Sequence, residues 1–100
     1  MCLVLEFAPG GSIASFTKKG SSRNQFLRQN ADDVIRFILG CVVLGLEFVH
    51  SRHIVYQDLK PNNLLVFDDG YIKMADFGVS KKMREGSYYL KPGMLCYFAP

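Results

Sequence analysis

The sequence predicts an α+β fold, on the strength of one helical stretch and one hairpin. Between Ile35 and Val49 only Arg36 and Glu47 are charged, which is typical of a long helix with apolar residues on nearly every side. Further along the chain, two short apolar runs flank Asp68-Asp69-Gly70, a segment typical of a β-hairpin turn. We therefore expect a helix and a hairpin to form the centre of the fold.

The first element that the sequence predicts is a buried strand over residues 2–7, where only Glu6 is charged. Residues 8–12 contain Pro and Gly and break this strand. A short helix is predicted over residues 12–19, and residues 20–24 have the composition of a loop.

The long helix that follows has a recognisable start. Asn30 is its candidate N-cap, and Asp32 and Asp33 lie in the first turn, where the helix dipole favours negative charge. A helix that is apolar on nearly every side belongs in the middle of a larger domain. Gly40 and Gly45 would allow neighbouring elements to approach it closely.

Four polar side chains stand around the predicted hairpin at a spacing that suits phosphoryl transfer: Asp58, Lys60, Asn63 and Asp76. This reaction requires positioning and charge neutralisation more than covalent chemistry, and Mg²⁺ prefers carboxylate and amide oxygens such as those of Asp76 and Asn63. Asp58 is then left to orient the attacking hydroxyl and accept its proton, with Lys60 near the transferred phosphate. Pro61 restricts Lys60 to extended conformations, which favours a loop.

Two other interpretations of these residues are open. Asp58 and Asn63 could simply belong to a turn before a strand, since each short motif taken singly is weak. Enzymes that phosphorylate small molecules also have an Asp and an Asn at this spacing, followed by a later Asp.

The segment Asp58-Leu59-Lys60-Pro61-Asn62-Asn63, followed by Asp76-Phe77-Gly78, resembles the catalytic and metal-binding loops of eukaryotic protein kinases. The pair Lys60-Pro61 and Gly78 favour protein kinases over small-molecule kinases, and Lys60 is typical of the serine/threonine subclass. The loop from Tyr56 to Asn63 most resembles that of the lipid- and nucleotide-regulated groups of protein kinases. The resemblance implies a protein-kinase-like fold, ATP and Mg²⁺ as nucleotide and metal, and a protein Ser or Thr hydroxyl as acceptor.

On the same resemblance, residues 2–12 match the hinge between the two lobes of a kinase. Leu5 matches the gatekeeper, the Glu6 carbonyl would accept a hydrogen bond from the adenine amine, and the Ala8 N–H would donate one to the ring. Leu65 matches the floor under adenine. Ser12 stands where many relatives have an acidic residue against the ribose, so we expect that contact to be weaker or absent.

Residues 79–92 resemble an activation loop, and residues 93–100 the substrate-docking segment that ends it. The hydroxyls in this stretch are candidate phosphorylation sites: Ser80, Ser87, Tyr88 and Tyr89. Two residues depart from the family pattern. Gln57 replaces an Arg that gathers a phosphate on the activation loop, and a neutral amide cannot form that charge-assisted pair. Met94 replaces a Thr that bonds the catalytic Asp and Lys.

The resemblance covers residues 1–100 as one partial kinase domain, from the hinge through the activation segment. Under this interpretation the small lobe and the C-terminal helices of the large lobe are absent, so we expect the isolated chain to be inactive. The alternative is a pseudokinase-like module that binds a nucleotide or a partner without catalysis. Intact Asp58, Asn63 and Asp76 favour the enzyme, whereas Gln57 and Met94 favour the alternative.

Composition limits the remaining classes. The 12 Lys and Arg are scattered and the formal charge is only +3, which argues against nucleic acid binding. Cys2, Cys41 and Cys96 are far apart and have no metal-ligand spacing, as expected of reduced thiols in a cytoplasmic or nuclear protein. No signal peptide is visible, and no apolar run reaches the ~18 residues of a transmembrane segment. The sequence leaves the oligomeric state and the protein substrate open.

Overall fold

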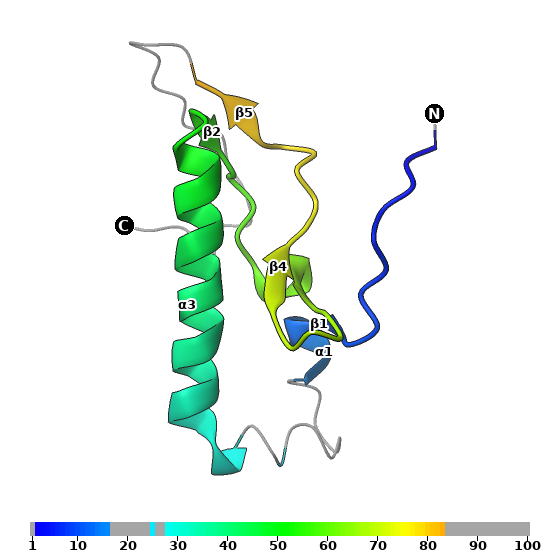
Figure 1. Ribbon diagram of the computed structural model, residues 1–100, viewed down its shortest axis with the longest axis vertical. Coiled ribbons are helices and arrows are strands. Elements are labelled where there is room, and N and C mark those ends of the chain that lie inside the picture. Colours follow the sequence, from blue (N-terminus) through cyan, green and yellow to red (C-terminus); the bar gives the residue numbers. More distant parts are fainter. Residues whose placement is uncertain (1, 17–24, 26–27, 84–100) are drawn as a thin grey trace.

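The computed structural model describes residues 2–16, 25 and 28–83, and it has the predicted α+β content (Figure 1). In chain order its elements are β1 (Gly11–Ser12), α1 (Ile13–Phe16), α3 (Ala31–His50), β2 (Ile54–Val55), η1 (Pro61–Asn63), β3 (Leu64–Val66), β4 (Ile72–Met74) and β5 (Lys81–Lys82). Among the described residues, no helix combines the length and hydrophobicity that a bilayer crossing requires.

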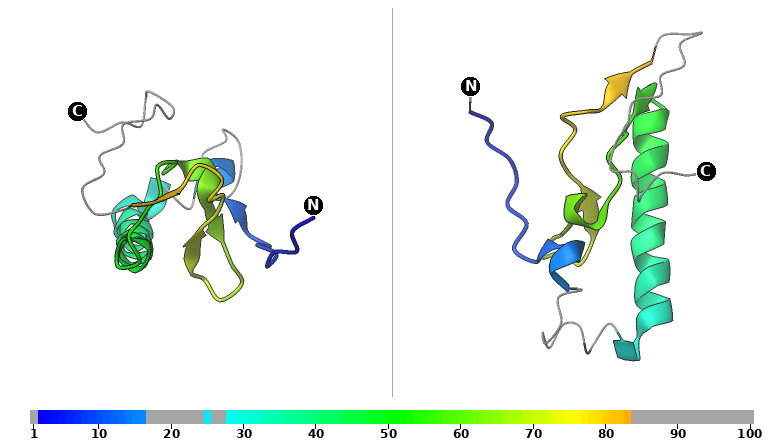
Figure 2. Two further views of the ribbon diagram at one scale, coloured as in Figure 1. Left: turned by 90° about the horizontal axis from the view of Figure 1, so that it is seen from above. Right: turned by 180° about the vertical axis from the view of Figure 1, so that it is seen from behind.

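The strands form two small antiparallel sheets. The first has three strands in the order β1-β3-β4, and the second pairs β2 with β5. In the first sheet Ser12 lies opposite Leu65, and Leu65 lies opposite Lys73. Figure 2 shows α3 on one side of this sheet and the N-terminal segment on the other. The sheet therefore separates the long helix from residues 2–8.

The predicted hairpin is confirmed, with β3 and β4 as its strands. The Phe67 N–H donates to the Tyr71 carbonyl at 3.0 Å, and the Phe67 carbonyl accepts from the Gly70 N–H at 3.1 Å. The Asp69 side chain accepts a further bond from the Tyr71 N–H at 2.9 Å. These three bonds close the turn locally, which is why the sequence alone was sufficient to predict it.

The helix α3 begins after Asn30, as predicted, although the Asn30 carbonyl and not its side chain makes the first helical bond, to the Val34 N–H at 3.0 Å. Its main contacts are with β4 and β2. A Cβ on Gly45 would come within 3.0 Å of the terminal methyl of Met74 on β4. Gly45 therefore allows the close approach that the sequence predicted for it, whereas a Cβ on Gly40 would have no described neighbour within 4 Å.

Most apolar side chains of α3 are exposed in the described part of the chain. Only Val42 and Val49 of α3 are buried. Leu44 is 65% exposed and Phe48 58%. The reason is geometric, because β4 and β2 line one side of the helix and leave the apolar residues of the other sides uncovered.

The prediction of a buried strand over residues 2–7 is wrong. Residues 2–8 have no regular secondary structure, and Val4 and Phe7 are 99% and 82% exposed. A strand requires a partner for its backbone N–H and C=O groups, and no described strand runs beside this segment. The first strand instead forms at residues 11–12, where the sequence predicted only the break after a strand.

Two further expectations are met only in part. The helix predicted over residues 12–19 is present as α1, and residues 17–19 lie outside the described residues, as do residues 20–24. Within the predicted activation loop, Lys81–Lys82 form β5, because they pair with β2, a strand far away in the sequence. Ser87, Tyr88, Tyr89 and Met94 lie outside the described residues.

Candidate active site

Three of the predicted catalytic side chains meet at Asp58. Lys60 donates a hydrogen bond from Nζ to Asp58 Oδ2 at 2.8 Å, and Asn63 donates one from Nδ2 to the same oxygen at 2.8 Å. Asn63 Nδ2 also donates to the backbone carbonyl of Asp58 at 3.0 Å. The amide nitrogen is thereby used within the loop, and the Asn63 side-chain oxygen takes no part in these bonds.

The local backbone explains how residues so near in sequence converge. Lys60 is extended, with φ −155° and ψ 156°, as the following Pro61 requires. The short helix η1 then turns the chain back, and the Asn63 N–H donates to the Lys60 carbonyl at 2.9 Å. Asn63 is buried as a result, and its orientation is set by its bonds to Asp58.

These contacts favour the ionised form of Asp58. The hydrogen bond from Lys60 lowers the pKa of the Asp58 carboxyl below its ordinary value of 3.8, and the bond from Asn63 adds to this effect against the opposing effect of desolvation. Asp58 is therefore a carboxylate at neutral pH, which is the form that can accept a proton.

Asp76 lies next to this cluster because the two loops are bonded to each other. The Ala75 N–H donates to the Asn63 carbonyl at 2.8 Å, which places Asp76 one residue beyond the contact. Asp76 has a left-handed backbone, with φ 59°, and its Oδ1 accepts from the Gly78 N–H at 3.2 Å. Asn63 and Asp76 thus present an amide oxygen and a carboxylate on adjoining chain segments, a donor set suited to Mg²⁺.

Tyr56 holds the two loops together, a role that the sequence did not indicate. Its hydroxyl donates to the Ala75 carbonyl, and its ring meets Phe77 edge-on with centroids 5.0 Å apart. Its own carbonyl accepts from Ser80 Oγ at 3.0 Å. Tyr56 is only 2% exposed, and burial raises the pKa of its phenol above 10.0, so the hydroxyl stays protonated and remains a donor.

A pocket of about 640 Å³ opens beside Asp76. Its lining includes Glu6 and Leu65, two of the three residues predicted to contact adenine, and the predicted metal ligand Asp76. Leu5, the residue matched to the gatekeeper, also lines it. Ala8, the third residue predicted to contact adenine, is not among the lining residues, and its carbonyl accepts from the Gly11 N–H at 3.1 Å.

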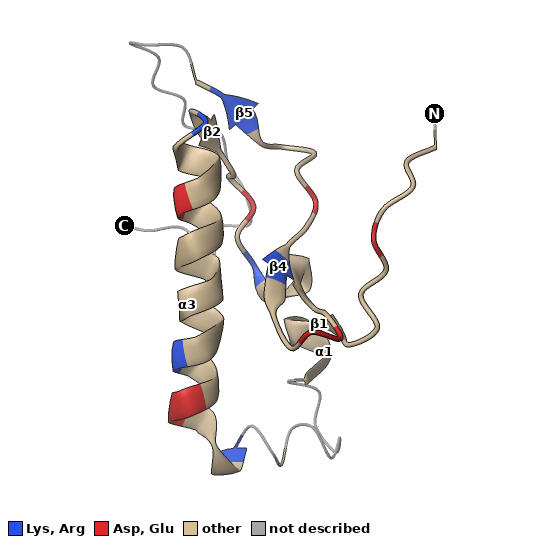
Figure 3. Cartoon of the chain, viewed as in Figure 1, with Lys and Arg blue, Asp and Glu red and all other residues tan. Residues whose placement is uncertain are grey.

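Lys73 of β4 lines this pocket, and, like Tyr56, it is a residue that the sequence did not indicate. It donates from Nζ to Glu6 Oε1 at 2.9 Å and to Oε2 at 3.2 Å. The hydrogen bond to Glu6 raises the pKa of the Lys73 ammonium above its ordinary value of 10.5. Figure 3 shows the acidic position on the N-terminal segment and the basic position on β4. No short-range pattern could have indicated this pair, since its members are 67 positions apart.

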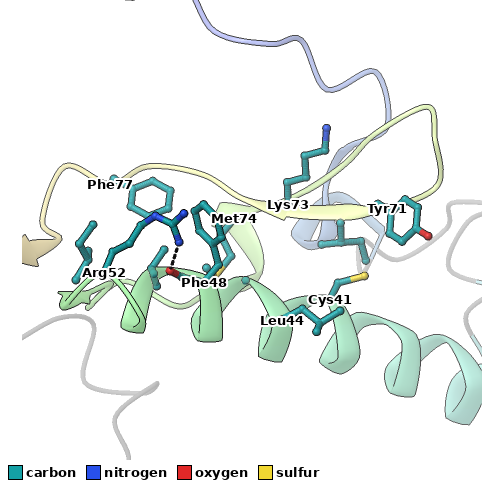
Figure 4. Close-up of a pocket in the computed structure, with 12 residues that line it drawn as sticks. Cys41, Leu44, Phe48, Arg52, Tyr71, Lys73, Met74 and Phe77 are labelled. Carbon is teal, nitrogen blue, oxygen red and sulfur yellow. Dashed lines mark hydrogen bonds between the residues drawn. The ribbon is translucent and has the colours of Figure 1, made fainter.

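A second pocket of about 620 Å³ lies between α3 and β4, on the other side of the sheet (Figure 4). Cys41, Leu44 and Phe48 line it from the helix, and Met74 lines it from the strand. The Arg52 guanidinium lies 3.5 Å from the centre of the Phe48 ring and donates to the Phe48 carbonyl at 3.1 Å. The lining of this pocket is mainly apolar and does not include Asp58, Asn63 or Asp76.

Comparison with known proteins agrees with the geometry. The family model described as "Protein kinase domain" matches residues 1–100. The chain is 39% identical over 98 residues to the cAMP-dependent protein kinase, catalytic subunit-like, of Caenorhabditis elegans, covering 98% of this chain and 23% of that protein. It is 37% identical over 95 residues to the serine/threonine-protein kinase AGC1-5 of Arabidopsis thaliana, covering 95% of this chain and 16% of the relative.

A third relative, the cGMP-dependent protein kinase, isozyme 2 forms cD5/T2, of Drosophila melanogaster, is 49% identical over 55 residues, which are 55% of this chain and 6% of the relative. The chain spans less than a quarter of the length of each of these three relatives. It belongs to the protein kinase family, in the serine/threonine class that the sequence predicted, and corresponds to part of a catalytic domain.

Proposed function

We propose that these residues transfer the γ-phosphate of ATP to a Ser or Thr hydroxyl of a protein substrate, as the central part of a kinase catalytic domain. The observation that carries the proposal is the cluster in which Lys60 and Asn63 both bond Asp58 Oδ2 at 2.8 Å. This cluster holds one ionised carboxylate at a fixed position next to two oxygen ligands suited to a metal. Such positioning is the main contribution that a protein makes to phosphoryl transfer.

Each side chain then has a defined task. Asp58 accepts the proton of the substrate hydroxyl, and Lys60 approaches the transferred phosphoryl group while remaining next to Asp58. Asn63 and Asp76 provide oxygen ligands for magnesium, which supplies neutralisation of the phosphate charge when it is bound. We locate this activity inside the cell, where ATP is abundant and the free thiols of Cys2 and Cys41 stay reduced.

The base of the nucleotide fits the 640 Å³ pocket. Leu65 provides an apolar surface there, which suits the proposed floor under adenine. The backbone carbonyl of Glu6, a residue that lines this pocket, is the proposed acceptor for the base edge. Exposed backbone without a strand partner is required for that role, and residues 2–8 have no regular secondary structure.

Phosphate transfer from radiolabelled Mg-ATP to a Ser/Thr peptide library tests the proposal directly, in the full-length protein. We expect Asp58→Ala to lower kcat by about 10²- to 10⁴-fold, the usual contribution of a general base. Asp68→Ala, which removes an exposed carboxylate at the hairpin turn, is the matched control and should leave kcat unchanged. Equal activity of both variants would contradict the role of Asp58.

The alternative function is binding of a nucleotide or a partner without transfer, and Gln57 is the observation that favours it. Gln57 has φ 66° directly before Asp58, and its neutral amide cannot attract a phosphorylated loop as an Arg would. A thermal shift measured with Mg-ATP on the purified chain separates binding from catalysis. A rise in Tm that disappears in Asp76→Ala, without phosphate transfer by the full-length protein, would favour the alternative.

A further inference from the structure

The N-terminal segment, residues 2–8, forms a wall of the nucleotide pocket although it has no strand partner among the described residues. It contributes Leu3, Leu5 and Glu6 to the lining. Leu3 and Leu5 are 74% and 79% exposed, so little apolar burial keeps the segment in place. The position of this wall must therefore depend on specific polar contacts.

One such contact is the ion pair between Glu6 and Lys73. Both carboxylate oxygens of Glu6 lie within hydrogen-bond distance of the Lys73 ammonium, at 2.9 and 3.2 Å. The ammonium also lies 4.0 Å from the centre of the Phe67 ring and 3.9 Å from Asp69 Oδ2. Phe67, Asp69 and Lys73 all belong to the β3–β4 hairpin, so the charge is held on the hairpin side and Glu6 is drawn towards it.

The pair also acts on the backbone of Glu6. When the carboxylate is bound to a strand of the sheet, rotation about the Glu6 backbone is restricted, and so is the direction of its carbonyl. This carbonyl is the group assigned above to the adenine amine. Leu5 precedes it in the same pocket wall, opposite the hairpin that carries Leu65.

We propose that Lys73 is a positioning residue for the nucleotide: through Glu6 it holds residues 2–8 at the spacing from Leu65 that a purine base requires. The inference rests on the proposed nucleotide site and adds to it the residue that sets the width of the base pocket. Lys73 acts through Glu6 and has no part in the transfer of the phosphoryl group. Its loss should therefore weaken nucleotide binding and leave the chemical step unaffected.

The test compares Mg-ADP affinity, by isothermal titration calorimetry, in the full-length wild-type protein and four variants: Lys73→Met, Glu6→Gln, Lys73→Glu, and the exchanged pair Glu6→Lys with Lys73→Glu. We expect Lys73→Met and Glu6→Gln to raise Kd by about two- to fivefold, as for loss of an exposed ion pair. Lys73→Glu should raise Kd further through like-charge repulsion, and the exchanged pair should recover part of this loss. Recovery stays incomplete because Asp69 remains next to position 73 in the exchanged pair. Lys82→Met, which removes an exposed lysine of β5, is the matched control.

Kinetics distinguish positioning from general loss of structure. In Lys73→Met, KM for ATP should rise while kcat stays constant, since only binding of the base is changed. Backbone NMR order parameters of residues 3–8 provide a readout that needs no nucleotide, and they should fall in both single neutral variants. Glu6→Gln leaves the hairpin intact, so it tests the ion pair even where a Lys73 variant is unstable.

Each outcome is decisive. If the wild type binds Mg-ADP and the Glu6 and Lys73 variants bind it equally well, or if the exchanged pair is no better than Lys73→Glu, the inference is overturned while the nucleotide site stands. If the folded wild type binds no Mg-ADP, the proposed function fails. Lower order parameters of residues 3–8 in Glu6→Gln would in that case still support the ion pair as the contact that holds the segment, and unchanged order parameters would overturn it.

Discussion

At the scale of single residues, the site depends on hydrogen bonds that each fix one functional atom. The Asp58 carboxylate is held by Lys60 and Asn63, and the Tyr56 hydroxyl joins the segment before Asp58 to the Ala75 carbonyl. These contacts involve different chemistry. The first sets the charge of a carboxyl group, and the second keeps two chain segments at a constant separation.

Replacement of Lys60 by Met should raise the pKa of Asp58, because the hydrogen bond from Lys60 is the largest cause of its lowering. In the unfolded chain an Asp carboxyl has a pKa of about 3.9. The stabilisation from Asp58 is therefore complete above that pH and is lost as the pH falls through the lower pKa of the folded state. A carboxyl-carbon NMR titration measures the Asp58 pKa in the wild type and in Lys60→Met. Lys82→Met is the control, and it should leave the Asp58 pKa unchanged. An Asp58 pKa at or above 3.9 in the wild type would contradict the geometry.

Replacement of Tyr56 by Phe should lower the free energy of unfolding by about 1 kcal/mol, since a buried hydrogen bond is lost and the ring is kept. Tyr71→Phe removes a hydroxyl from a side chain that is 59% exposed, and this control should have a much smaller effect. Urea unfolding followed by circular dichroism provides the comparison. Equal stability of the two variants would show that the bond to Ala75 carries no net free energy.

At the scale of secondary-structure elements, close approaches of the backbone determine where the strands and the helix lie. The Gly10 N–H donates to the Val66 carbonyl at 3.0 Å, just before β1 pairs with β3. A Cβ at Gly10 would lie 2.6 Å from Val66 Cβ and 2.8 Å from the Val66 carbonyl oxygen. The end of the N-terminal segment is thus placed against β3 by a residue without a side chain.

Gly10→Ala should destabilise the protein by about 1–3 kcal/mol, because both the backbone and the strand must shift to admit the methyl group. Gly40→Ala is the matched control: it lies within α3, where a Cβ would meet no described atom within 4 Å. Since Ala favours a helix over Gly, this variant should gain about 0.5–1 kcal/mol. Thermal unfolding measures both, and a tolerated Gly10→Ala would contradict the packing of β1 on β3.

Two adjacent residues of α3 test which side of the helix is buried. Val42 is 7% exposed and Val43 is 61% exposed. Truncation of Val42 to Ala should lower the free energy of unfolding by about 1–2 kcal/mol, whereas Val43→Ala should change it by less than about 0.5 kcal/mol. The same urea experiment decides the matter, and a larger effect at Val43 would mean that the helix is rotated.

At the scale of the whole molecule, the chain is less compact than a typical domain of its length. Its radius of gyration is 15.1 Å, compared with about 13 Å for a compact domain of this length. Apolar side chains on α3 and on the N-terminal segment are exposed on opposite sides of the sheet. A surface of this kind favours association.

We expect the purified 100-residue chain to associate with itself as its concentration is raised. Leu44→Glu should reduce this association, because it introduces a charge on the exposed apolar side of α3. Gln29→Glu adds the same charge at an exposed polar position before α3 and should have little effect. Sedimentation velocity over a range of concentrations measures the change, and a chain that remains monomeric throughout would contradict the expectation.

The sequence was sufficient for the parts of the protein in which the interacting groups are neighbours along the chain. Asp58, Lys60 and Asn63 lie within one loop that Pro61 keeps extended, and the hairpin is closed by its own turn residues. The start of α3 at Asn30 also follows from local signals. In each case short-range backbone preferences determine the outcome, so the pattern of residues alone predicts it.

Only the tertiary structure decided how the distant segments meet. Glu6 and Lys73 are 67 positions apart, and Tyr56 reaches Ala75 across 19. Residues 2–7 are exposed because no described strand lies beside them, and β5 forms because β2 lies next to it. Local composition decides neither outcome. The sequence by itself therefore determined the family and the local geometry of the loop at residues 58–63, whereas long-range contacts decided the shape of the pocket beside it.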